Sequence, residues 1–162
     1  MKTLLLLRHA KSSWAEAGVS DHDRPLNDRG KRDAPQVGRL LRERDLLPDC
    51  VLSSTAKRAR KTAAKVLAAA ELAENFELVP EFYLAPPTVY IEKLRTLPDS
   101  CQRVLVVGHN PGMEELLSAF TGEETSMPTA AIAQIEFEIE AWSELQLTSP
   151  ARLVWFARPS AE

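Results

Sequence analysis

The chain opens with Thr3-Leu4-Leu5-Leu6-Leu7-Arg8-His9-Ala10, a run of four leucines followed by an arginine and a histidine. An uninterrupted apolar run of this length is typical of a strand that is buried on both faces of a parallel sheet. The run is too short for a secretory signal segment or for a membrane span. We therefore expect a cytoplasmic chain, not bound to a membrane, whose first strand ends at the polar pair Arg8-His9.

Further apolar runs follow, and helical patterns lie between them. The expected strands are Cys50 to Leu52, Phe76 to Val79 and Val104 to Val107. The expected helices cover residues 30–47, 56–73, 88–97 and 113–120, although Pro35 leaves the first turns of the first helix open. This alternation predicts an α/β fold, a three-layer α/β/α sandwich around a mostly parallel sheet.

The last part of the chain has a different pattern. Residues 135–140 alternate strictly between apolar and acidic side chains, which is typical of a half-exposed strand. Residues 152–156 would pair with it near an edge of the sheet. No repeat or linker divides the sequence, and we expect residues 1–162 to form a single domain.

Composition narrows the function classes. The chain has 162 residues, of which 44% are hydrophobic and 27% charged, as in an ordinary globular protein. Its formal charge of −3 lacks the basic surplus of a general nucleic-acid binder, so we expect no nucleic-acid partner. Cys50 and Cys101 show no CxxC spacing, and we expect both to be reduced, structural thiols.

Polar clusters follow three of the expected strands. Arg8-His9 ends the first strand, residues 53–58 end the second, and residues 108–112 end the strand that begins near Arg103. In open α/β sheets, ligands bind outside the carboxyl ends of the strands. We therefore expect two imidazoles and two guanidinium groups to gather around one bound anion.

Two expected helix starts add backbone N–H groups to this edge of the sheet. Asn110 can cap the second of these helices, with Pro111 at its first helical position. Helix N-termini attract anions, and arginine binds phosphate oxygens in a planar fork. Such a pocket suits a phosphate group.

Other routes to phosphate chemistry are missing from the sequence. It has no GxxxxGK[ST] loop, no Asp-rich or HExxH metal spacing and no GxSxG elbow. A neutral imidazole can attack phosphorus near neutral pH, so histidine is the natural nucleophile. We therefore expect activity without a cofactor or a metal ion.

At these residues the chain resembles the histidine phosphatase superfamily, which has the phosphoglycerate mutase-like fold. The opening Leu4 to Ala10 matches that family's strand followed by Arg-His-Gly/Ala. Ser53 to Ala63 is similar to its second arginine motif, with Thr55 where the family often has proline. Gly108 to Pro111 matches its second histidine motif.

Within this superfamily, the compact length and the segment from Asp21 to Gly30 resemble the SixA group of phosphohistidine phosphatases. The resemblance implies that His9 is the phosphorylated nucleophile and that Arg8, Arg58 and His109 act with it. It also implies that the phosphoryl group is bound by Arg8, Arg24, Arg58, His109 and Asn110.

The general acid is left open. A carboxylate after the third strand protonates the leaving oxygen in larger relatives, and Glu81 lies in that region of the sequence. Asp21, in the SixA-like segment, is the rival. A leaving imidazole departs neutral if its ring is already protonated, so phosphohistidine needs less acid catalysis than an alcohol ester.

Phosphohistidine on a protein is the substrate that the sequence favours, and a small phosphate ester is the alternative. A non-catalytic phosphoprotein-binding module is disfavoured by the intact histidine pair. A mutase is disfavoured because no insertion is present to enclose an intermediate.

Several conspicuous residues have ordinary explanations. The three tryptophans show no cofactor pattern and are expected to be packing residues: Trp14, Trp142 and Trp155. His22 is expected at the surface. The cations beside Arg58 are expected to be solvated: Lys57, Arg60 and Lys61.

Overall fold

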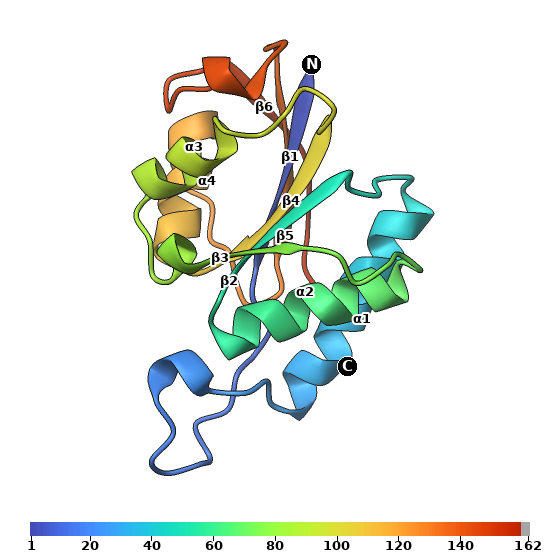
Figure 1. Cartoon of the computed structure of the whole chain (residues 1–162), viewed down its shortest axis with the longest axis vertical. Coiled ribbons are helices and arrows are strands. Elements are labelled where there is room, and N and C mark those ends of the chain that lie inside the picture. Colours follow the sequence, from blue (N-terminus) through green and yellow to red (C-terminus); the bar gives the residue numbers. More distant parts are fainter. Residues whose placement is uncertain (160–162) are drawn as a thin grey trace.

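The leucine run forms β1 (Lys2–Arg8), an inner strand of a six-stranded sheet (Figure 1). The computed structural model describes residues 1–159. β1 pairs in parallel with β4 (Arg103–Gly108) and antiparallel with β5 (Ile132–Phe137). All four leucines are fully buried, as the absence of alternation predicts.

The leucines serve two separate cores because successive side chains of a strand point to opposite faces of the sheet. Leu4 and Leu6 pack in one cluster with α3 (Pro87–Leu94) and α4 (Gly112–Thr121). Leu5 and Leu7 pack in the other cluster with α1 (Asp28–Glu43) and α2 (Lys57–Ala69). Figure 1 shows these helix pairs on opposite sides of the sheet, which confirms the predicted three-layer α/β architecture.

The strand order is β3-β2-β4-β1-β5-β6. β2 (Cys50–Ser54) pairs in parallel with β4 and with the short β3 (Glu77–Val79). β6 (Ala151–Ala157) pairs antiparallel with β5 and forms an edge. Short 3-10 turns occupy three connections: Asp21–Asp23 (η1), Pro80–Phe82 (η2) and Trp142–Glu144 (η3).

Several predicted boundaries differ from the structure: α1, α2 and α3 each end three or four residues earlier than expected, and β5 and the start of α1 differ as well. β5 begins at Ile132 and ends at Phe137, although burial continues to alternate through residue 140. Alternating apolar and polar residues indicate which side of a segment faces the core, but an extended segment can have this pattern without pairing in a sheet. α1 begins at Asp28, capped by the Asn27 side chain, and continues through Pro35.

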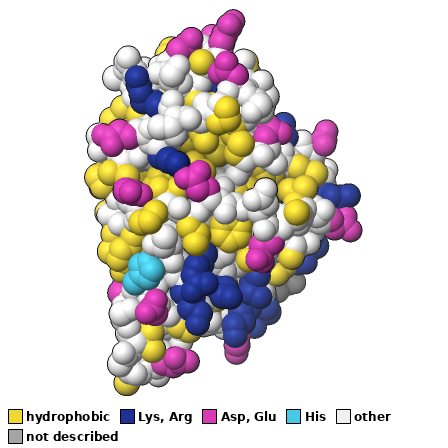
Figure 2. All heavy atoms as spheres, in the orientation of Figure 1, with side chains coloured by type: hydrophobic (Ala, Val, Ile, Leu, Met, Phe, Trp, Pro, Cys, Tyr) yellow, Lys and Arg dark blue, Asp and Glu magenta, His cyan; other side chains and the backbone are white. Residues whose placement is uncertain are grey.

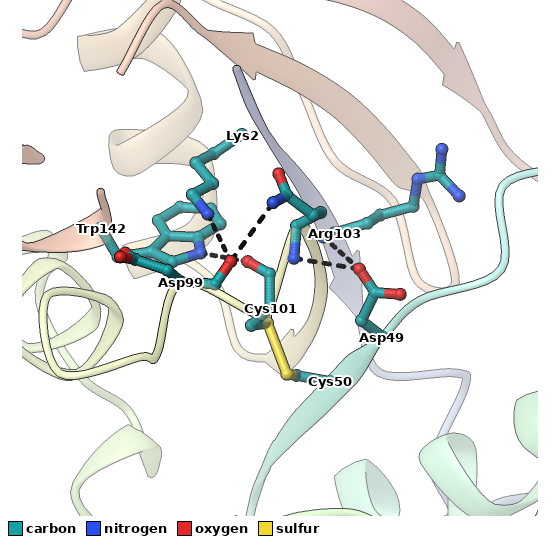
Figure 3. Close-up of a disulfide and its surroundings, with 8 residues drawn as sticks. Lys2, Asp49, Cys50, Asp99, Cys101, Arg103 and Trp142 are labelled. Carbon is teal, nitrogen blue, oxygen red and sulfur yellow. Dashed lines mark hydrogen bonds between the residues drawn. A yellow bond between two sulfur atoms is a disulfide. The ribbon is translucent and has the colours of Figure 1, made fainter. Parts of the chain in front are cut away.

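The two cysteines form a disulfide, so the expectation of two free thiols was wrong (Figure 3). Cys50 starts β2 and Cys101 precedes β4, with their Cα atoms 5.9 Å apart. The parallel register aligns Cys50 with Val104, three residues beyond Cys101, so the pairing of β2 with β4 places both cysteines at the same end of the sheet. The disulfide lies at the amino ends of these strands, opposite the edge where the polar clusters gather.

Gly38 sets how closely α1 and α2 approach each other. A Cβ at this position would lie 2.3 Å from the Val66 carbonyl oxygen and 2.8 Å from the Ala69 Cβ. Gly38→Ala gains about 1 kcal/mol of helix propensity but forces the helices apart, at a cost of about 1–3 kcal/mol or more. We expect a net fall in the free energy of unfolding, measured by urea titration.

The matched control is Arg39→Ala, an exposed position on the same helix. It should change the free energy of unfolding by no more than about 0.5 kcal/mol. A Gly38→Ala protein as stable as the parent chain would contradict the close contact between the two helices.

Candidate active site

The polar clusters meet at the carboxyl ends of β1, β2 and β4, as predicted. Arg8 ends β1 and pairs in register with Gly108, the last residue of β4. His9 therefore follows one strand and His109 the other, and their ring centroids are 5.2 Å apart. Arg58 reaches the same place from the first turn of α2.

His9 is held as a neutral imidazole with one nitrogen available. Its Nδ1 lies 2.7 Å from the Ala10 carbonyl oxygen, which can only accept, so Nδ1 carries the proton and Nε2 keeps its lone pair. Burial, opposed by this hydrogen bond but reinforced by the nearby arginines, lowers the pKa of His9 to about 3. The ring is therefore unprotonated at neutral pH, a state in which an imidazole can act as a nucleophile.

Ser54, the last residue of β2, holds the second histidine. Its Oγ lies 2.8 Å from His109 Nε2 and accepts a hydrogen bond from the Ala56 N–H. The hydroxyl therefore has its own proton to donate to Nε2, which favours the tautomer with a proton on Nδ1. Burial, together with repulsion from a protonated His9 ring and from Arg58, lowers the pKa of His109 to about 3.

Three buried donors at this edge have no hydrogen-bond partner within residues 1–159: Arg8 Nε, Arg58 Nε and His109 Nδ1. Buried polar atoms are normally paired, so each such group needs an explanation. All three residues line one cavity of about 390 Å³ together with His9. The guanidinium and imidazole groups that line this cavity are suited to an oxyanion, which offers several acceptor oxygens.

Asp21 organises the arginines of the site. Its carboxylate accepts hydrogen bonds from Arg58 Nη2 and Arg24 Nε, both at 3.1 Å, and from the Tyr83 hydroxyl. These contacts, led by the Tyr83 hydrogen bond, lower the pKa of Asp21 to about 2. The carboxylate is ionised near neutral pH, a state that has no proton to give, so this geometry opposes the predicted acid role.

Glu81 is not in the catalytic cavity. It is exposed on η2 and lines a separate cavity with residues of β3 and α3. Tyr83, two residues later, takes the place at the site instead, with its ring 5.5 Å from that of His109. Nothing in the sequence marked Tyr83, because a 3-10 turn decides which of these neighbouring side chains points inward.

Asn110 lines the cavity but does not cap α4, so the predicted cap was wrong. The α4 helix begins at Gly112 without a side-chain cap. The amide of Asn110 donates instead to the Met127 carbonyl oxygen at 2.9 Å, which also accepts from Arg8 Nη1 at 3.0 Å. The Met127 carbonyl, more than a hundred residues from Arg8 in the sequence, therefore holds the end of β1 and the loop after β4 together.

The cavity combines a cationic floor with an apolar rim. Trp14 is 77% exposed and Leu84 is 55% exposed. The guanidinium of Arg24, which donates to Ser12 Oγ at 2.8 Å, lies 3.5 Å from the centroid of the Trp14 ring. The complete lining is Arg8, His9, Lys11, Ser12, Trp14, Asp21, Arg24, Arg58, Leu84, His109, Asn110 and Thr129.

The tryptophans expected to pack in the core differ in their burial. Trp142 is buried and packs in the core as predicted, whereas the packing role expected for Trp14 was wrong. His22 is partly exposed and its Nε2 contacts Thr55 Oγ1 at 2.8 Å. Within the described residues, no three His, Cys, Asp or Glu side chains are grouped to hold a metal ion, and no helix could cross a membrane.

Comparison with known proteins identifies related chains. The family model of the histidine phosphatase superfamily (branch 1) matches residues 4–82. An uncharacterized chloroplastic protein of Arabidopsis thaliana is 33% identical over 88% of this chain and 70% of its own. An uncharacterized protein of Mycobacterium tuberculosis is 38% identical over 78% of this chain and 84% of its own.

Solved structures show the same fold. A candidate phosphohistidine phosphatase SixA of Agrobacterium tumefaciens is 32% identical, with a TM-score of 0.83 and 98% of each chain covered. The protein histidine phosphatase SixA in complex with tungstate has a TM-score of 0.82 at 24% identity, covering 97% of each chain.

The lowered pKa values predict how stability depends on pH. In the unfolded chain the histidines bind protons below about pH 6.5, whereas in the folded chain His9 and His109 bind them only near pH 3. Their contribution is complete above about pH 6.5 and is lost as the pH falls toward 3, by about 1.4 kcal/mol per pH unit for each ring. Urea titrations at several pH values measure this slope.

The double variant His9→Gln/His109→Gln should flatten the slope, because it removes both rings. Nitrogen NMR of the parent chain should show both rings neutral down to about pH 5. A midpoint near pH 6.5 for either ring would contradict the lowered pKa values.

Proposed function

Because the chain belongs to the histidine phosphatase superfamily as a SixA-type member, we propose that it hydrolyses phosphohistidine on a protein through a phosphorylated His9. The family and its structural neighbours give the coarser activity, that of a phosphatase. The observation that supports the finer proposal is the neutral His9 ring, with Nε2 free, among Arg8, Arg58 and His109.

In the first step, the Nε2 lone pair of His9 attacks phosphorus while the bond from phosphorus to the substrate nitrogen breaks. Arg8, Arg58 and His109 donate to the equatorial oxygens, and Arg24 assists from beside Asp21. Two unit charges 4 Å apart attract each other by about 4 kcal/mol at an effective dielectric near 20, before desolvation is subtracted. Several cations around one phosphoryl group therefore stabilise the transition state substantially.

In the second step, water attacks the phosphorus of phospho-His9 and the His9 ring leaves as a neutral imidazole. The hydrogen bond from Nδ1 to the Ala10 carbonyl keeps the proton on the far nitrogen and stabilises the positive charge of the phosphorylated ring. Ala10 is itself fixed by its N–H bond to Thr62 Oγ1 of α2. The nucleophile is therefore held by both β1 and α2.

The acid–base character of the cavity favours phosphohistidine over a small ester. Among the lining residues the only carboxyl is Asp21, which is ionised and bound to two arginines. An alkoxide leaving group requires a proton donor, whereas an imidazole protonated on its second nitrogen leaves neutral. A site with four cations and no protonated carboxyl therefore suits the nitrogen–phosphorus bond.

The nucleophile assignment is tested by rapid-quench labelling. We expect an acid-labile, alkali-stable phosphoryl group on His9, and a fall in kcat of about 10³-fold or more in His9→Ala. The matched control is His22→Ala, which removes a histidine that does not line the cavity and should leave labelling unchanged. Unchanged turnover in His9→Ala would end the assignment.

The substrate class is tested by a panel of phosphohistidyl protein, free phosphohistidine, phosphoserine and an aryl phosphate. We expect kcat/KM to be highest for the nitrogen–phosphorus substrates, because their leaving group needs no acid. Glu81→Gln should leave every rate unchanged, since Glu81 lies in another cavity. Rapid ester turnover without action on phosphohistidine would favour the ester alternative.

A further inference from the structure

The outward face of α2 is cationic from its first turn to Lys65. Lys57, Lys61 and Lys65 are spaced four residues apart, and Arg60 lies beside them on the same face. The helix contains no aspartate or glutamate. Figure 2 shows Lys and Arg side chains gathered over the part of the surface where α2 lies in Figure 1.

The α2 cationic face consists of four side chains: Lys57, Arg60, Lys61 and Lys65. None of them forms an ion pair within 4 Å in the described part of the chain. Arg60 acts on Asp23 only at longer range. Other exposed cations do pair: Arg42 with Glu71, and Arg152 with Glu136. Some exposed cations elsewhere in the described residues, such as Lys31 and Arg39, have no ion pair either, so the α2 cationic face is distinguished by having four unpaired cations together on one helix.

The arrangement is unfavourable for the helix itself. Like charges four residues apart repel each other. The first turn of a helix favours anions, yet that of α2 carries Lys57, Arg58 and Arg60. Folding therefore does not explain why cations are placed here, and an external anionic surface would relieve both effects.

The α2 cationic face begins beside Arg58, which lines the proposed catalytic cavity. Arg58 turns inward from the first turn of α2 and is only 3% exposed, whereas its neighbour Lys57 turns outward. A protein that presents a phosphoryl group to Arg58 must therefore come close to Lys57 and the turns behind it.

We propose that the α2 cationic face docks an acidic surface that surrounds the phosphohistidine of the substrate protein. The proposal rests on the proposed function, since it names the chemistry of the same substrate. The whole chain has a formal charge of −3, so the remaining surface is more acidic still and repels such a partner. Attraction at one face and repulsion elsewhere would orient the phosphoprotein for reaction.

The test uses two phosphohistidine peptides of equal length, one flanked by aspartates and the other by asparagines. We expect kcat/KM to be about tenfold higher for the acidic peptide at low salt, with a smaller difference at high salt. Lys57→Glu/Lys61→Glu should abolish or reverse this preference. Hydrolysis of free phosphohistidine, which has no flanking charge, should be unchanged in that variant.

The matched control is Arg39→Glu/Arg44→Glu, which makes the same change in net charge at the far end of α1. These positions lie roughly 16 Å or more along the helix from its start beside the site. The control should keep the preference for the acidic peptide. Loss of the preference in both variants would show an effect of net charge alone and would overturn the proposal.

A binding experiment separates this proposal from the proposed function. Fluorescence anisotropy measures the affinity of the unphosphorylated acidic and neutral peptides for the parent chain and both variants. If no phosphohistidine is hydrolysed, the proposed function fails, while tighter binding of the acidic peptide through Lys57 and Lys61 still supports the docking surface. Equal affinities for the two peptides would overturn it.

The same assay includes an oligonucleotide and phosphatidylserine vesicles as other anionic partners. Tighter binding of either one through Lys57 and Lys61 would also overturn the proposal, because it would assign the α2 cationic face to a different class of partner.

Discussion

The register between β1 and β4 is the constraint on which the site depends. The four leucines of β1 alternate between two helical layers, so a shift of one residue would exchange the two cores. The observed register aligns Arg8 with Gly108, and the His9 N–H donates to the Gly108 carbonyl at 3.1 Å. Packing in the two cores therefore places the two imidazoles side by side at the end of the sheet.

Burial then determines the electrostatic state of the site. Both histidines remain neutral because neighbouring arginines and the lack of solvent oppose protonation. Asp21 offsets part of the positive charge and holds two guanidinium groups through hydrogen bonds to its carboxylate. The result is a preorganised cationic cavity in which the proposed nucleophile needs no separate base, and the buried neutral rings lower the stability of the fold in acid.

Much of this could be predicted from the sequence, because the burial of a strand is evident from its own residues and parallel strands bring their carboxyl ends to one edge of the sheet. The positions of His9, Arg58 and His109 follow from those two rules. The disulfide, Tyr83 and the Met127 carbonyl could not be predicted, since each depends on how distant segments meet. Glu81 and Asn110 show the same limit: one 3-10 turn and one loop carbonyl redirected side chains whose sequence positions favoured other roles.

The helix α2 shows how similar cationic side chains acquire different roles. Lys57, Arg58, Arg60 and Lys61 are chemically similar and adjacent in sequence, yet the helical period turns only Arg58 toward the sheet. There it gains Asp21 as a partner and faces the cavity, while its neighbours stay unpaired in solvent. The helix α2 therefore contributes Arg58 to the proposed phosphoryl-binding cavity and its other cations to the proposed docking surface for the substrate protein.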